Sequence, residues 1–198
     1  MRLDIEFQLQ KFSGKRRVRS DFDLDPDKKH IARTALKPAA VLVPLVDYGT
    51  HYSILLTKRA GHLKKHAGQI SFPGGRVEKQ DTCLLQTALR ETYEEIGLPK
   101  DYITVMGKLD PYVTVTEYEV SPYVGLVKPG FSYRPDHNEV DEVFEIPLDF
   151  ILDTEKHKIE EVMFKGKLRR YYAMPYKGYY IWGATAAMLV NLAEILNS

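Results

Sequence analysis

The sequence predicts an α+β domain in which a mixed β-sheet lies between helices, an α/β/α sandwich. Three observations lead to this class. Short apolar runs at 39–47 and 51–59 predict two neighbouring strands. A helical pattern over 81–96 stands in the middle of the chain, and an amphipathic helical pattern over 184–196 stands near its end. Further strand-like runs between the two helices complete the layered domain.

The strands are separated by recognisable turn signals. Tyr48-Gly49-Thr50 is typical of a hairpin turn between the first two strands. The run 69–75 predicts a third strand that leads into a tight turn at Gly74 and Gly75. Later strands are expected at 103–110, 119–127, 142–148 and 178–182, with a hairpin over 159–172.

The middle helix has signals at both ends. Asp81 can cap its start, and Gly97 followed by Pro99 ends it. The residues expected to face the core are Leu85, Leu89, Thr92 and Ile96.

Composition limits the class of protein. The 198 residues suit one domain with a short appendage, and 44% apolar with 28% charged residues suits a soluble globular fold. A net charge of +1 gives no general attraction to nucleic acid or to membranes. Cys83 is the one cysteine, and charges interrupt any signal-like segment at the start. The sequence therefore predicts a cytoplasmic protein with no nucleic-acid or membrane partner.

Residues 1–35 differ in texture from residues 36–198, so we expect an N-terminal extension followed by one domain. An acidic run at 21–27 follows a basic cluster. The extension is expected to be helical or partly ordered, and its cluster is either a solvated face or a contact for substrate or partner. The basic residues are Lys11, Lys15, Arg16, Arg17 and Arg19.

Three carboxylates are stacked near the end of the middle helix. Glu91, Glu94 and Glu95 stand at i, i+3 and i+4, within about 100° of arc. Each such like-charge pair costs about 0.2–0.5 kcal/mol, and the helix dipole also disfavours anions there. A divalent cation that prefers oxygen ligands, Mg²⁺ or Mn²⁺, would offset this repulsion between the carboxylates. Arg90 can pair with Glu94, although these residues taken alone are more typical of a solvated acidic face.

The segment Arg90-Glu91-Thr92-Tyr93-Glu94-Glu95-Ile96-Gly97-Leu98, after the Gly-Gly pair, resembles the box of the Nudix hydrolases. Two features depart from that pattern. Asp81 replaces the early glutamate and lies one residue further from Arg90 than is usual, and Thr92 stands where an aliphatic residue is usual. The core of the box is intact.

A second motif precedes the box. Leu55-Leu56-Thr57-Lys58-Arg59-Ala60, then Lys64, Gly68 and Phe72-Pro73-Gly74-Gly75, resembles the motif of the coenzyme A pyrophosphatase branch of this family. Its one departure is Lys64 in place of arginine, which keeps the charge but loses the bidentate fork. The similarity extends over roughly residues 36–196.

The resemblance implies a metal-dependent enzyme that cleaves the diphosphate of coenzyme A or a derivative into 3′,5′-ADP and 4′-phosphopantetheine. It implies Mg²⁺ or Mn²⁺ at Glu91 and Glu95, with Glu94 as the next ligand, and Arg90 as the residue that orients them. A late acidic residue, Glu139 in preference to Glu142, is expected to act as base or extra ligand. The residues expected to approach substrate are Arg59, Lys64, Gly74 and Gly75.

Alternatives stay open at this point. The same box serves other nucleoside-diphosphate compounds, such as ADP-ribose and dinucleotides, and a related protein could bind a nucleotide without catalysis. The substrate is in each case a small molecule. Several aromatic residues near the end could stack on adenine, pack in the core or form a homodimer interface. These are Trp182 and the tyrosines at 171, 172, 176, 179 and 180.

Overall fold

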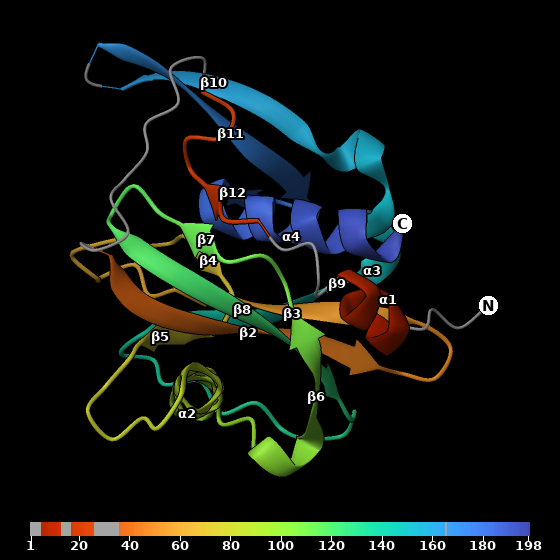
Figure 1. Ribbon diagram of the computed structural model, residues 1–198. Helices are drawn as coiled ribbons and strands as arrows, with labels where there is room; N and C mark the ends of the chain where they lie inside the picture. The colour runs from red at the N-terminus through yellow and green to blue at the C-terminus, as the bar shows by residue number, and fades with distance from the viewer. Residues whose placement is uncertain (1–4, 13–16, 26–35, 165) are drawn as a thin grey trace.

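The computed structural model describes residues 5–12, 17–25, 36–164 and 166–198. A mixed sheet forms the centre of the molecule, with helices on both sides (Figure 1). In the described chain this sheet has nine strands. They are β1 (Arg19–Ser20), β2 (Lys37–Asp47), β3 (Tyr52–Arg59), β4 (Ile70–Ser71), β5 (Gly74–Arg76), β6 (Ile103–Lys108), β7 (Tyr112–Val113), β8 (Tyr118–Val127) and β9 (Val140–Pro147).

Helix α2 (Leu84–Ile96) covers one face of this sheet, and α4 (Gly183–Leu196) lies on the other. The short helices α1 (Ile5–Phe12) and α3 (Leu148–Leu152) pack beside α4. The predicted α/β/α sandwich is therefore confirmed. A second sheet lies beyond α4 and was not predicted as a layer (Figure 1). It consists of β10 (Lys158–Phe164), β11 (Lys167–Tyr176) and β12 (Tyr179–Trp182).

Strand β2 organises the central sheet. It pairs in parallel with β8 from Lys37↔Tyr118 to Val46↔Val127, and antiparallel with β3 and β5. Its alternate residues enter different cores, Leu42 on the α2 side and Val43 on the α4 side. A strand covered on both faces has no polar side, which is why 39–46 reads as a continuous apolar run.

The last helix differs from the prediction. The pattern indicated an amphipathic helix, but eleven of the fourteen residues of α4 are buried. The helix is covered by the central sheet on one side and by the second sheet on the other. Even Asn191 is buried, where its side chain accepts a hydrogen bond from the Asp110 amide at 2.9 Å.

The described part of the N-terminal segment packs against the domain. Ile5 and Leu9 of α1 enter the core beside α4. Arg19 is 7% exposed and donates to Asp110 at 2.8 Å, and it also pairs with Glu194. Lys15 and Arg16 of the basic cluster, and residues 26–27 of the acidic run, lie outside the described residues. Among the described residues, no helix is long and apolar enough to cross a bilayer.

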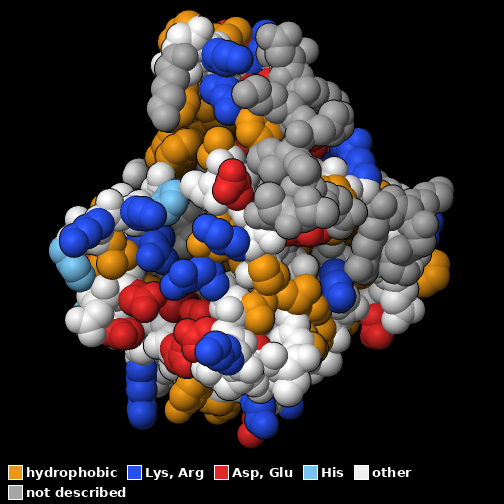
Figure 2. Space-filling view, turned by 60° about the vertical axis from the view of Figure 1, so that its left-hand side comes forward, with side chains coloured by type: hydrophobic (Ala, Val, Ile, Leu, Met, Phe, Trp, Pro, Cys, Tyr) orange, Lys and Arg blue, Asp and Glu red, His pale blue; other side chains and the backbone are white. Residues whose placement is uncertain are grey.

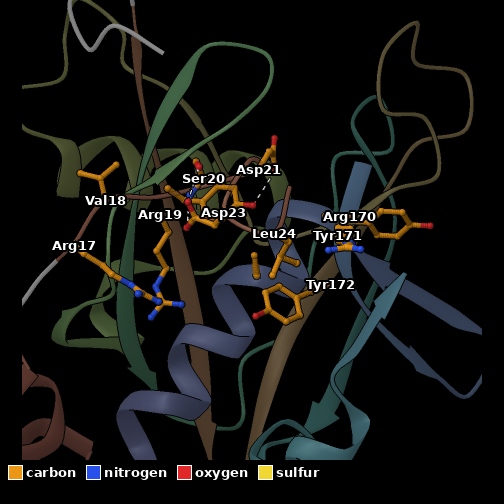
Figure 3. Close-up of a pocket in the computed structure, with 13 residues that line it drawn as sticks. Arg17, Val18, Arg19, Ser20, Asp21, Asp23, Leu24, Arg170, Tyr171 and Tyr172 are labelled. Carbon is orange, nitrogen blue, oxygen red and sulfur yellow. Dashed lines mark hydrogen bonds between the residues drawn. The ribbon is translucent and has the colours of Figure 1, made fainter. Parts of the chain in front are cut away.

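A cavity of about 350 Å³ lies where this segment crosses the second sheet and the start of α4. Figure 3 shows the side chains of Arg17 and Arg19 on one side of it and those of Arg170 and Tyr171 on the other. Arg170 is already paired with Glu161 and Arg19 with two acids, and Asp21 and Asp23 line the same cavity as Arg17, so the lining has little net positive charge for an anion. None of the predicted site residues lines this cavity.

Candidate active site

Helix α2 begins three residues later than predicted. It runs from Leu84, and its N-cap residue, Cys83, makes no side-chain capping bond. Ile96 and Thr92 are buried as expected, while Leu85 and Leu89 are half-buried against the same core. The hydroxyl of Thr92 donates to the Ala88 carbonyl at 2.7 Å, which explains how a polar residue fits a position where an aliphatic one is usual.

The end of the helix is as predicted. Gly97 takes a left-handed conformation with φ of 70°, and its amide donates to the Tyr93 carbonyl at 2.8 Å. The chain therefore leaves α2 directly after the carboxylates, with Glu95 and Ile96 still inside the helix.

Asp81 does not cap the helix, and its actual role is one the sequence did not reveal. Its carboxylate accepts two hydrogen bonds from Arg90, from Nε at 3.0 Å and from Nη2 at 2.9 Å. It also accepts from the Glu78 amide and the Thr87 hydroxyl, both at 2.9 Å. The Arg90 hydrogen bonds are the main reason that the pKa of Asp81 lies well below its usual range.

Arg90 in turn is bound on several sides. Besides Asp81, it contacts Glu91 at 3.1 Å, Glu94 at 2.8 Å and the Arg76 carbonyl at 3.2 Å. The predicted pairing with Glu94 is present. Because Asp81 fixes the guanidinium from the far side, Arg90 can hold Glu91 in place while Glu94 lies on the solvent side.

Gly74 and Gly75 are not a tight turn before the helix. They form β5, an edge segment paired with Val41 and Ala40 of β2, and a loop of residues 77–83 separates them from α2. The expected close approach to the backbone is nevertheless real. A Cβ on Gly75 would lie closer than 3.0 Å to the carboxylate atoms of Glu91. This glycine therefore makes room for the Glu91 side chain.

Glu95 is the most buried of the three box carboxylates, with 3% exposure. Its Oε2 accepts a hydrogen bond from the Gly74 amide at 3.2 Å, and its Oε1 lies 3.8 Å from Nη1 of Arg59. Burial raises the pKa of Glu95 to about 8, and the charges of Glu91 and Glu139 add to that rise. Burial also raises the pKa of Glu91.

The remaining predicted residues lie at different distances from this centre. Glu139 acts electrostatically on both Glu91 and Glu95, and its carbonyl accepts from the Ala60 amide at 2.9 Å. Lys64 is exposed on the 60–69 loop. Glu142 accepts a hydrogen bond from the Tyr179 hydroxyl. Figure 2 shows one face where acidic side chains gather beside Lys, Arg and His side chains.

The aromatic residues near the end of the chain divide into two groups. Tyr179 stacks on Phe144 with ring centroids 3.8 Å apart and belongs to the core. Tyr180 and Trp182 are exposed on the second sheet, where Tyr171 meets the Trp182 ring edge-on at 5.4 Å. Of the roles left open for these residues, core packing is therefore confirmed for Tyr179.

The donor set fits a hard divalent cation. In the described part of the chain, no three His, Cys, Asp or Glu side chains form a complete metal site by themselves. Two carboxylates suffice for Mg²⁺, which keeps several waters and takes further oxygens from substrate phosphates. The described ion pairs and charge interactions join five carboxylates to two guanidinium groups, which leaves an excess of negative charge. The groups are Asp81, Glu91, Glu94, Glu95 and Glu139 with Arg59 and Arg90.

We expect Asp81→Asn to lower activity about tenfold, because outer partners of metal ligands typically contribute 10–100-fold. The amide cannot hold both guanidinium nitrogens as a carboxylate does, so Arg90 loses its fixed orientation behind Glu91. Thermal unfolding and kcat would be measured together. Asp101→Asn is a matched control, since Asp101 lies on the turn at Lys100–Tyr102, outside this network. Unchanged activity in Asp81→Asn would contradict the role assigned to this contact.

Comparison with known proteins places the chain in a family. The family model described as NUDIX domain matches residues 36–166. An uncharacterized Nudix hydrolase, NudL, of Enterobacter sp. (strain 638) is 39% identical over 157 residues, which are 79% of this chain and 81% of that protein. NudL of Escherichia coli O6:H1 is 40% identical over the same shares. A solved Ap4A hydrolase binary complex from C. elegans is 20% identical over 56% of this chain and 80% of its own, with a TM-score of 0.49. The family model and the two NudL relatives show that the chain belongs to the Nudix hydrolases.

Proposed function

We propose that this protein is a Mg²⁺- or Mn²⁺-dependent hydrolase that cleaves the diphosphate of coenzyme A or its derivatives to 3′,5′-ADP and 4′-phosphopantetheine. One observation carries the proposal. The segment that resembles the coenzyme A branch, residues 55–75, contributes both Arg59 and the Gly74 amide to the surroundings of Glu95. Residues 55–75 and helix α2 therefore contact each other at the Glu95 carboxylate.

The chemistry follows from the roles of the side chains. Glu91 and Glu95 would hold the cation, which supplies Lewis acidity to the phosphoryl oxygens and a more acidic water. Glu94, which is more exposed, is the third candidate ligand. Arg90 keeps Glu91 oriented. Glu139, whose charge acts on both ligands, would accept the proton of the attacking water or act as an extra ligand.

Arg59 and Lys64 would bind anionic oxygens of the substrate. Coenzyme A carries a 3′-phosphate in addition to its diphosphate, so a second cationic group on the 60–69 loop has a physical use. Gly74 and Gly75 let the substrate approach the backbone of β5 closely.

A substrate panel tests the proposal. The full-length protein with Mg²⁺ or Mn²⁺ would be given coenzyme A, ADP-ribose, a dinucleoside polyphosphate and a deoxynucleoside triphosphate, with products resolved by mass. We expect 3′,5′-ADP from coenzyme A as the main product. Preferred turnover of ADP-ribose or a dinucleotide would instead assign the same carboxylate site to another diphosphate. Tight binding without turnover would indicate a nucleotide-binding regulator.

We expect Lys64→Ala to raise KM for coenzyme A about tenfold while leaving KM for ADP-ribose nearly unchanged. The reason is that an exposed lysine on this loop would contact the 3′-phosphate, which ADP-ribose lacks. Steady-state kinetics with both substrates gives the comparison. Lys79→Ala, another exposed lysine, serves as the control. An equal loss on both substrates would point to a structural role for Lys64.

A further inference from the structure

Arg59 has a defined place beside α2. It is the last residue of β3, and its amide donates to the Gln69 carbonyl at 2.9 Å while its own carbonyl accepts from Gly68 at 3.0 Å. A register shift against β9 occurs between Lys58 and Arg59. The backbone is thus fixed at both ends of the 60–69 loop, and this places the guanidinium next to Glu95.

The described residues use little of the hydrogen-bonding capacity of this guanidinium. Its Nη1 lies 3.8 Å from Oε1 of Glu95, which is too long for a hydrogen bond. Its Nε is buried without a partner, and no other buried side-chain polar atom among the described residues lacks one. Buried donors are normally paired because an unpaired one costs free energy. The position therefore fits a group whose better partner arrives from outside the protein.

The carboxylate that faces Arg59 is also incompletely balanced. Oε2 of Glu95 is bonded to the Gly74 amide, whereas among the described residues Oε1 has only the Arg59 charge, 3.8 Å away, opposite it. Glu91 and Glu139 add negative charge nearby, and they raise the pKa of Glu95 further. One monovalent cation at 3.8 Å is a weak counter-charge for this group.

We propose that Arg59 is a stand-in cation: its guanidinium balances Glu95 in the metal-free protein, and it turns to an anionic oxygen of the substrate once a divalent cation binds Glu95. The inference rests on the proposed function for the presence of a metal at Glu95, but not on coenzyme A as the substrate. The metal ion and Arg59 then compete for the Glu95 carboxylate. Binding of the metal ion frees Arg59 for the substrate, so metal and substrate each increase the affinity for the other.

Electrostatics predicts how loss of the Arg59 charge changes metal affinity and stability. Removing the Arg59 charge takes away a repulsion against the arriving ion, so the metal binds more tightly. This holds even where Glu95 carries a proton in the metal-free protein, because the ion brings two positive charges and displaces one. Where Glu95 is ionised, the same removal leaves it without its nearest positive charge, so the metal-free fold becomes less stable.

The test uses the full-length protein with Arg59→Met, Arg59→Gln and Arg59→Lys. Lys58→Met is the matched control, since it removes the same charge from the neighbouring residue of β3, which forms no ion pair with Glu91, Glu94 or Glu95 in the described part of the chain. Calorimetric titration with Mn²⁺, titration with ADP in the presence of Mn²⁺, and thermal unfolding in EDTA are the readouts.

Both neutral variants should bind Mn²⁺ about tenfold more tightly, bind ADP about tenfold more weakly and unfold at a lower Tm in EDTA. Arg59→Lys should keep the wild-type Mn²⁺ affinity and lose part of the ADP affinity, because it keeps the charge without the fork. Lys58→Met should leave both affinities unchanged. If the Met variant does not fold, Arg59→Gln, which keeps a polar group, provides the comparison.

Equal or weaker Mn²⁺ binding in both neutral variants would overturn the stand-in role and leave the proposed function untouched. Tighter Mn²⁺ binding together with no turnover of coenzyme A would support the stand-in role and overturn the proposed substrate. No Mn²⁺ binding by the wild-type protein would overturn both.

Discussion

Replacing Glu95 with glutamine is expected to lower kcat more than about a hundredfold, because even the indirect partners of metal ligands contribute 10–100-fold. Glutamine has the same shape and can still accept the Gly74 hydrogen bond, so the local backbone is kept. What it loses is the charged oxygen that faces Arg59 and the proposed cation. Activity with Mg²⁺ and with Mn²⁺, and Mn²⁺ affinity, are the measurements.

The same substitution should raise stability in the absence of metal. Burial raises the pKa of Glu95 from an ordinary value near 4.5 to about 8, so the folded state binds more protons than the unfolded state between those values. The stability contributed by the protonated group is present below 4.5 and is lost as pH rises through about 8. Glutamine does not titrate, so the Glu95→Gln protein does not lose this stability as the pH rises.

Thermal unfolding in EDTA at pH 6 and pH 9 measures this effect. The Tm of the wild-type protein should fall more between the two values than the Tm of Glu95→Gln. Glu94→Gln is the matched control, because its side chain is 55% exposed. Wild-type activity in Glu95→Gln would contradict the assignment of Glu95 as a metal ligand. A Tm at pH 9 that is lower for Glu95→Gln than for the wild-type protein would contradict the account of Glu95 burial.

The position of the box helix could be predicted from the sequence because its signals are local. Gly97 ends the helix through a contact four residues away, and the spacing of Glu91 and Glu95 fixes their relative direction. The alternation of β2 between two cores is equally local in origin. These features depend on neighbours along the chain, and the sequence displays such neighbours directly.

The errors arise where distant segments decide the structure. Gly74 and Gly75 looked like a turn because nothing nearby shows that β2, more than thirty residues earlier, pairs with them. Asp81 looked like a helix cap, whereas the helix begins only at Leu84 and the Asp81 carboxylate binds Arg90, nine positions further along the chain. The apparent polar side of α4 is covered by a second sheet, and nothing within the helix sequence shows that this sheet packs on it. The one available signal for Asp81 was its unusual spacing from Arg90.

Gly75→Ala is expected to separate activity from folding. Gly75 has no positive φ, so its backbone accepts an alanine, but the new Cβ would stand closer than 3.0 Å to the carboxylate atoms of Glu91. The far end of a flexible side chain moves more easily than backbone does. Glu91 should therefore be displaced from its place beside β5 and Arg90, and kcat should fall about a hundredfold with little change in Tm.

Two other glycines give the controls. A Cβ on Gly61 would meet no atom closer than 3.7 Å, so Gly61→Ala should keep both activity and Tm. A Cβ on Gly74 would clash with the backbone of Ala40 and Val41, and its φ of 152° is also unfavourable, so Gly74→Ala should unfold the protein. The three variants thus distinguish a general intolerance of alanine from the specific displacement of Glu91.

A double-mutant cycle completes the argument. If Gly75→Ala acts only by displacing Glu91, then adding it to Glu91→Gln should cost almost nothing further, because the carboxylate has already lost its charge. Additive losses in kcat would mean that Gly75 has another role, such as close contact of substrate with the β5 backbone. In that outcome KM should rise in the single Gly75 variant, whereas displacement of Glu91 lowers kcat and Mn²⁺ affinity together.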